Sequence, residues 1–132
     1  MFKAQTEWNK PEEFPDLREC NQIAIDLETH DPDLKSMGSG AVVGRGKVVG
    51  IAVATEGYTG YFPFDHKGGG NLEKSKVIQW FTDVCKSDAD KIFHNAMYDV
   101  CWIRSMGIQI NGRIFDTMIA ASLVNENRFR FD

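Results

Sequence analysis

The segment IAIDLETH, residues 23–30, indicates both the fold and the chemistry of this chain. Apolar residues occupy every second position from Ile23 to Leu27, which is typical of a strand with one buried face. Residues two apart in a strand point to the same side, so Asp26 and Glu28 lie together on the opposite face. Adjacent carboxylates repel each other, and a cation bound by both removes that cost. The pair therefore indicates a divalent-metal site, although such a pair can also simply solvate an edge strand.

Length and charge favour a single soluble domain. The chain has 132 residues, of which 42% are hydrophobic and 26% charged, ordinary values for one globular domain. Its formal net charge of -4 argues against non-specific nucleic-acid binding by phosphate neutralisation, but not against an enzyme that brings cations to the phosphate. The chain shows no signal peptide and no apolar run of membrane-spanning length, and its three cysteines are widely spaced. We therefore expect a cytoplasmic protein with reduced thiols and no membrane partner.

The rest of the pattern predicts an α/β fold with a mixed five-stranded sheet. Residues 47–55 are rich in β-branched side chains, and a short turn at residues 56–57 joins them to a further strand, which predicts a hairpin. Strands then alternate with helical periodicity, an order typical of a ribonuclease H-like sheet flanked by helices. We expect an irregular lead-in or a short helix over residues 1–19. We expect strands over 20–28, 47–55, 58–64, 90–93 and 108–115, and helices over 72–86 (capped by Asn71), 96–106 and 116–123.

The glycine-rich segment GSGAVVGRGK, residues 38–47, does not fit a phosphate-binding loop. The Walker spacing requires glycine where Ala41 stands, and Ser or Thr where Val48 stands. We therefore expect a flexible turn before a strand.

The segment HNAMYD, residues 94–99, is the second group of candidate site residues. Asn95 and Asp99 are four residues apart at the start of a predicted helix, so they share one helical face. Each could serve only the helix end, as an N-cap and a first-turn acid. Together with Asp26 and Glu28, however, Asp99 makes three carboxylates that converge at one edge of the sheet. Three acids around one point suit two-metal phosphodiester hydrolysis, with Mg²⁺ or Mn²⁺ as the ions that oxygen ligands prefer. We expect His94, like His66, to be a hydrogen-bonded structural residue.

These motifs resemble the 3′–5′ proofreading exonuclease domain of family A DNA polymerases, within the DEDD (DnaQ-like) superfamily, and the phage-type branch most of all. Residues 26–29 are similar to the family's D-x-E-T motif, and residues 95–99 to its N-x-x-x-D motif. GYFPFDH, residues 60–66, resembles the family's Y-x-P…H segment, and RIFDTMIAASLVN, residues 113–125, its F-D-T-M junction. The resemblance covers residues 20–132 with the motifs in the family's order.

The resemblance implies a metal-dependent exonuclease that acts on the 3′ end of single-stranded DNA, with two divalent ions, Mg²⁺ or Mn²⁺, as cofactors. Asp116 falls at a helix cap in this pattern, so we expect it to be structural. By position, the metal ligands and catalytic residues are Asp26, Glu28 and Asp99, and the groups that meet the terminal nucleotide are the Leu27–Glu28 backbone, Thr29 and Asn95.

The pattern departs from the family after Asn125. The family's later Tyr-x-x-x-Asp or His-x-x-x-Asp motif supplies a fourth carboxylate and orients the attacking water, whereas here Asp132 follows Arg128 at that spacing. We therefore expect residues 20–132 to be an incomplete exonuclease domain without its C-terminal helices, weakly active or inactive, in a bacterial or phage-infected cell.

The remainder of a polymerase chain is then the expected partner, and the uncovered face favours self-association. Two alternatives stay open. One is a non-catalytic remnant that serves as a structural or nucleic-acid-end-binding module, and the other is a different ribonuclease H-like nuclease.

Overall fold

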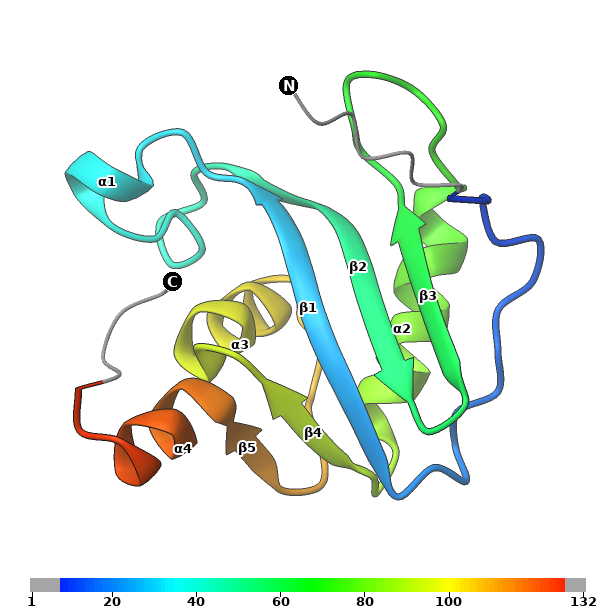
Figure 1. Ribbon diagram of the computed structural model, residues 1–132. Coiled ribbons are helices and arrows are strands. Elements are labelled where there is room, and N and C mark those ends of the chain that lie inside the picture. The colour runs from blue at the N-terminus through cyan, green and yellow to red at the C-terminus, as the bar shows by residue number, and fades with distance from the viewer. Residues whose placement is uncertain (1–7, 128–132) are drawn as a thin grey trace, which may run out of the picture.

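A computed structural model describes residues 8–127 of the chain (Figure 1). Its five strands form one sheet in the order β3-β2-β1-β4-β5. β1 pairs antiparallel with β2 and β2 with β3, whereas β1 and β4, and β4 and β5, pair in parallel. The predicted mixed five-stranded sheet is therefore confirmed. The elements are β1 (Gln22–His30), α1 (Leu34–Met37), β2 (Lys47–Thr55), β3 (Tyr58–Pro63), α2 (Lys74–Lys86), β4 (Asp90–Phe93), α3 (Ala96–Ser105), β5 (Ile114–Asp116) and α4 (Thr117–Val124).

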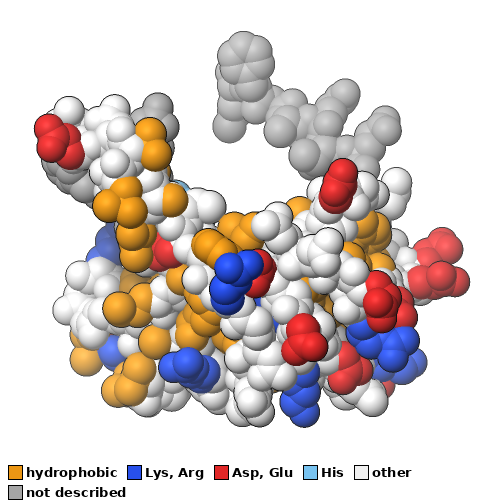
Figure 2. Space-filling view, turned by 90° about the horizontal axis from the view of Figure 1, so that it is seen from below, with side chains coloured by type: hydrophobic (Ala, Val, Ile, Leu, Met, Phe, Trp, Pro, Cys, Tyr) orange, Lys and Arg blue, Asp and Glu red, His pale blue; other side chains and the backbone are white. Residues whose placement is uncertain are grey.

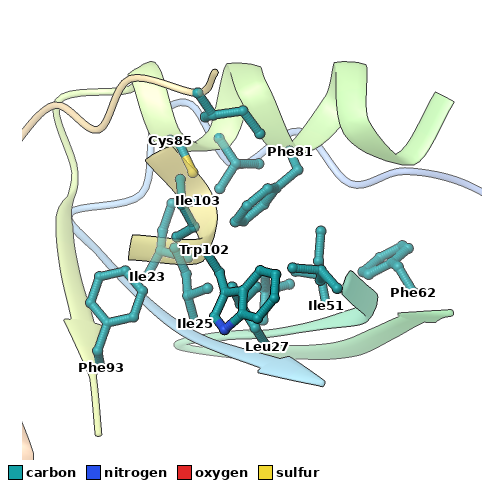
Figure 3. Close-up of a cluster of buried hydrophobic side chains, with 14 of the residues drawn as sticks. Ile23, Ile25, Leu27, Ile51, Phe62, Phe81, Cys85, Phe93, Trp102 and Ile103 are labelled. Carbon is teal, nitrogen blue, oxygen red and sulfur yellow. The ribbon is translucent and has the colours of Figure 1, made fainter. Parts of the chain in front are cut away.

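The two faces of the sheet differ because β1 alternates between apolar and polar residues. Its apolar residues point to the face that α2 and α3 cover, where they form the core of the protein (Figure 3). Burial of such side chains is the main favourable contribution to folding, at about 25 cal/mol for each Å² of apolar surface. The side chains labelled in the core are Ile23, Ile25, Leu27, Ile51, Phe62, Phe81, Cys85, Phe93, Trp102 and Ile103.

The opposite face of β1 and β2 is open and carries small side chains. Across the strand pair, Ala24 lies opposite Ala54, and Asp26 lies opposite Ala52. No helix within residues 8–127 lies in front of this part of the sheet in Figure 1. The acidic pair of β1 is therefore displayed on an exposed surface whose floor is made of alanine.

The described lead-in before β1, residues 8–21, is irregular and packs against the core. Within residues 8–21 it contains neither helix nor strand. The Phe14 ring stacks on that of Phe62 with centroids 5.7 Å apart, Leu17 is buried, and Trp80 donates its indole N–H to the carbonyl oxygen of Pro15 at 2.8 Å. These residues seal the edge of the core beside α2.

The structure corrects the predicted element boundaries at three places. The first strand continues to His30, and a short helix, α1, interrupts the loop that follows it. Asn71 is not a helix cap: α2 begins at Lys74, and the Asn71 side chain instead exchanges two hydrogen bonds with the backbone of His66. The last strand is limited to residues 114–116, because Gly112 turns the chain with φ of 79°, so close to Ala89 that a Cβ would lie 2.1 Å from its carbonyl oxygen.

A fully buried lysine, Lys91, fixes the start of β4. Its Nζ donates to the carbonyl oxygens of Ala89 at 2.8 Å and Asn111 at 2.9 Å, and also to that of Ser87 just after α2. Carbonyl groups at a helix end have no partner inside the helix, so the ammonium group satisfies them. Burial lowers the pKa of Lys91. Its role is structural.

The three cysteines are free thiols, as expected. Cys85 is buried, and burial raises its pKa to about 12, which keeps this thiol unreactive. Cys20 and Cys101 are half-buried. None of the helices in the described part of the chain is long and apolar enough to cross a membrane.

Candidate active site

The structure places Asp99 beside the strand that carries Asp26 and Glu28. Asp99 stands in the first turn of α3, only 3% exposed, whereas Asp26 and Glu28 are exposed on β1. Burial, together with the charges of Asp26 and then Glu28, raises the pKa of Asp99 to about 7, against a hydrogen bond from the Leu27 backbone N–H. The buried carboxyl thus contacts β1 at the residue between the two exposed acids, and the charges of both acids raise its pKa.

The donors of this cluster suit a hard cation. Asp99 Oδ2 is buried and has no hydrogen-bond partner among the described residues. An unpaired buried oxygen beside two further carboxylates is costly, and a divalent cation would relieve both the missing contact and the repulsion. Within residues 8–127, however, no three His, Cys, Asp or Glu side chains are close enough together to form a ready-made metal cage. The carboxylate oxygens therefore suit a cation, but the described residues do not form a complete set of metal ligands.

Asn95 occupies the N-cap position of α3 in a strained conformation. Its φ of 63° is left-handed, and no other non-glycine residue between 8 and 127 has a positive φ. Asn tolerates this region better than most residues, and such strain clusters at functional sites. The Asn95 side chain makes no cap hydrogen bond, and the residue lines the groove described below. The simple helix-cap interpretation of this residue therefore does not hold.

Asp116 connects the starts of two helices. Its carboxylate accepts hydrogen bonds from the backbone N–H groups of Asn95 at 3.0 Å, Ala96 at 2.9 Å and Met118 at 2.9 Å. Although burial opposes it, these bonds lower the pKa of Asp116. The predicted capping of α4 is confirmed, and the same carboxylate also holds the first turn of α3, which the sequence did not reveal.

Thr29 takes part in a hydroxyl network beside the acids. A break in the β1–β2 register between Glu28 and Thr29 re-aims this side chain. Its Oγ1 lies 2.8 Å from the Tyr98 hydroxyl, which also donates to Asp31 Oδ2 at 3.3 Å. Tyr98 and Asp31 were not identified from the sequence, although Tyr98 directly precedes Asp99. Because the Leu27 side chain is buried, only the backbone of this residue could contact a nucleotide.

The two histidines are hydrogen-bonded, as predicted. His66 Nε2 bonds to the Tyr61 hydroxyl, and His94 Nδ1 lies 2.9 Å from the hydroxyl oxygen of Thr117 at the start of α4.

A broad groove of about 1110 Å³ runs over the open face of the sheet to the acidic cluster. Its floor includes the alanines of β1 and β2, and Asp26, Asn95 and Asp99 lie along it. Trp8 and Tyr61 also line it, with ring centroids 6.0 Å apart. The described residues that line the groove include no Lys or Arg. A phosphate bound here would therefore need cations and neutral donors.

Hydrophobic side chains are exposed to one side of this groove. Figure 2 shows them gathered on the side of the molecule where Figure 1 places β5 and α4. In α4, Ile119 is 58% exposed, Leu123 84% and Val124 89%. This helix has no buried residue in the described part of the chain.

Comparison with known proteins identifies the family of this chain. A family model described as 3′–5′ exonuclease, of the DNA polymerase A type, matches residues 6–132. The chain belongs to this exonuclease family. It is 35% identical over 130 residues to a DNA-directed DNA polymerase of Pseudomonas phage M6, covering 92% of this chain and 19% of the phage protein. It is 30% identical over 112 residues to DNA polymerase I of Borreliella burgdorferi, covering 84% of this chain and 11% of that polymerase. The exonuclease domain therefore spans less than a fifth of each relative.

Solved structures share the fold of this exonuclease domain. Brucella melitensis NrnC with bound Mg²⁺ superposes with a TM-score of 0.57 at 18% identity, covering 88% of this chain and 52% of that one. Trypanosoma brucei RNase D in complex with RNA U12 gives a TM-score of 0.59 at 15% identity, covering 82% of this chain and 34% of that one. The predicted ribonuclease H-like exonuclease fold is therefore confirmed.

Proposed function

We propose that this domain is a metal-dependent 3′–5′ exonuclease that removes nucleotides from single-stranded DNA ends, as a proofreading unit of a polymerase. Asp26, Glu28 and Asp99 hold two divalent cations, Mg²⁺ or Mn²⁺. The observation that carries the proposal is the buried Asp99 carboxyl, whose Oδ2 has no partner within residues 8–127 while the charges of two acids on β1 act on it. Once ionised, a carboxyl in this setting is costly to the fold unless a cation binds it.

The chain's own residues would then divide the work between holding cations and holding the nucleotide. Divalent cations at such a site polarise a phosphodiester and offset the charge that develops during its hydrolysis. Asn95, Thr29 and the Leu27–Glu28 backbone lie along or beside the groove and would orient the terminal nucleotide. Because no Lys or Arg in the described part of the chain lines the groove, binding of DNA would depend on the cations more than in a basic nuclease.

We infer that the 132 residues alone have weak or no activity. They contain no Tyr-x-x-x-Asp or His-x-x-x-Asp motif after Asn125, so a fourth carboxylate and a water-orienting side chain are missing. Loss of such a group typically costs orders of magnitude in rate.

The test is calorimetric titration of the chain with Mn²⁺, followed by digestion of a 5′-labelled single-stranded oligonucleotide. Mn²⁺ should bind to the wild type, and both Asp26→Asn and Asp99→Asn should weaken that binding at least tenfold. Glu56→Gln, in the β2–β3 turn, serves as the matched control and should bind as the wild type does. A wild type that does not bind Mn²⁺ would refute the proposed metal site. Rapid digestion that Asp26→Ala abolishes would refute only the expected weak activity.

A second candidate is a non-catalytic module that binds a nucleic-acid end or serves as a structural unit. The incomplete set of metal ligands favours this candidate, because no group of three ligands lies close enough together within residues 8–127 to hold a metal ion. Binding of Mn²⁺ and dTMP without digestion would indicate end binding, and binding of neither would indicate a purely structural role.

The proposed partners follow from the lengths of the relatives and from the exposed helix. Each relative is a polymerase more than five times as long as the matched segment, so the remainder of a polymerase chain is the proposed partner. The exposed apolar side chains of α4 would also permit self-association in its absence. The proposed location is the cytoplasm of a bacterial or phage-infected cell.

A further inference from the structure

A tyrosine outside the acidic cluster reaches toward it across the open face of the sheet. In the strand register, Asp26, Ala52 and Tyr61 form one row, and Glu28 and Gly50 pair in a neighbouring row. The Tyr61 ring leans onto this neighbouring row, because a Cβ on Gly50 would lie 2.2 Å from the Tyr61 hydroxyl oxygen. Paired residues on adjacent antiparallel strands are about 4.5–5.5 Å apart. The hydroxyl therefore lies one strand away from Glu28.

The Tyr61 hydroxyl is held in place by a loop beyond its own strand. It forms a hydrogen bond with His66 Nε2. The backbone of His66 is fixed in turn, since its N–H donates to Asn71 Oδ1 at 2.8 Å and its carbonyl accepts from Asn71 Nδ2 at 2.9 Å. A donor that is already immobilised loses little conformational entropy when a ligand binds. Burial and then the charge of Glu28 raise the pKa of Tyr61, so the group remains a protonated donor at neutral pH.

The groove needs such a donor. The described residues that line it include no Lys or Arg, so a phosphate would be met by cations and by neutral N–H and O–H groups. On the basis of the proposed function, we propose that Tyr61 is a nucleotide-binding residue whose hydroxyl, lying opposite Glu28 over Gly50, donates to a phosphate oxygen of the bound nucleotide. His66 is the positioning residue: in the tautomer with its proton on Nε2 it donates to the Tyr61 oxygen, which leaves the one hydroxyl proton free for the phosphate.

The experiment separates metal binding from nucleotide binding. Calorimetry measures the affinity for Mn²⁺ alone and then the affinity for dTMP at saturating Mn²⁺. Tyr61→Phe removes only the hydroxyl, so it should leave Mn²⁺ affinity unchanged and weaken dTMP binding about tenfold, the effect of losing one hydrogen bond to a charged group. Glu56→Gln is the control, since Glu56 lies in the turn between β2 and β3, outside the described lining of the groove. It should bind dTMP as the wild type does.

A second variant tests the role of His66. His66→Ala should weaken dTMP binding, the double variant with Tyr61→Phe should be no weaker than Tyr61→Phe alone, and His66→Gln should restore part of the loss. Unchanged urea unfolding midpoints for these variants would show that the fold is retained.

Two results would overturn the role of Tyr61 while leaving the metal site intact. One is undiminished dTMP affinity of Tyr61→Phe in a protein that binds Mn²⁺. The other is an equal loss of Mn²⁺ and dTMP affinity, which would mean that Tyr61 acts on Glu28 instead. If the wild type binds no Mn²⁺, the proposed nuclease site fails first, and the role of Tyr61 falls with it.

Discussion

Replacing Asp99 by asparagine should make the stability of the protein depend less on pH. In the folded protein the pKa of Asp99 is about 7, against an ordinary value of 3.8. Between these values the folded state binds a proton that the unfolded chain releases, so this group makes the protein less stable as pH rises from about 4 to about 7. Each pH unit within this window is worth about 1.36 kcal/mol. The whole difference between the folded and the ordinary pKa of Asp99 therefore corresponds to about 4 kcal/mol of destabilisation above pH 7.

Urea unfolding followed by tryptophan fluorescence measures this difference directly. The amide introduced by Asp99→Asn would keep an acceptor for the Leu27 N–H but would not titrate. The unfolding free energy of this variant relative to wild type should therefore rise by about 3 kcal/mol from about pH 4.5 to about pH 8. Ionisable groups away from this acidic cluster titrate equally in both proteins. Asp26→Asn should give a smaller rise, because Asp26 is second to burial among the causes of the shift. Glu56→Gln should give none. A flat difference for Asp99→Asn would refute the account of this site as a buried acid beside two charges.

Three further perturbations test other parts of the structure. Lys91→Met should lower the unfolding free energy by about 2–4 kcal/mol in urea titrations, because three carbonyl groups lose their donor, and an unchanged value would contradict the structural role of this lysine. Asp116→Ala should cost about 2–3 kcal/mol and reduce hydrogen-exchange protection at Asn95 and Ala96, whereas loss of protection at Met118 alone would show that the carboxylate caps only α4. Leu123→Lys should shift the chain toward monomer in sedimentation velocity, and a wild type that is monomeric at all concentrations would argue against self-association through α4.

The sequence predicted those parts of the fold that depend on periodicity. Alternation in β1 placed its apolar residues in the core and its acids outside, and the β-branched run of β2 with its short turn identified the hairpin. Helical spacing placed Asn95 and Asp99 at the start of α3. These features depend only on residues close together in the chain, so they can be predicted from a single sequence.

The features that were missed depend on contacts between distant segments. Nothing near Lys91 indicates that its ammonium group satisfies a helix end and a later loop. The second role of Asp116 depends on β4 and β5 lying side by side, which brings two helix starts together. The hydrogen bond between the hydroxyl groups of Thr29 and Tyr98 joins residues that are 69 apart in the sequence. Asn71 is a residue type that often caps helices, but its side chain forms hydrogen bonds with the backbone of His66 instead.

The shared carboxylate of Asp116 has a mechanical consequence. One rigid group holds both the α4 start, whose helix presents bare apolar side chains to solvent, and the strained turn from which Asp99 projects. A polypeptide that clamps the outer surface of α4 would therefore also stiffen the turn beneath the acid, without touching it. Binding of a partner at α4 would in this way be coupled to the acidic cluster through Asp116.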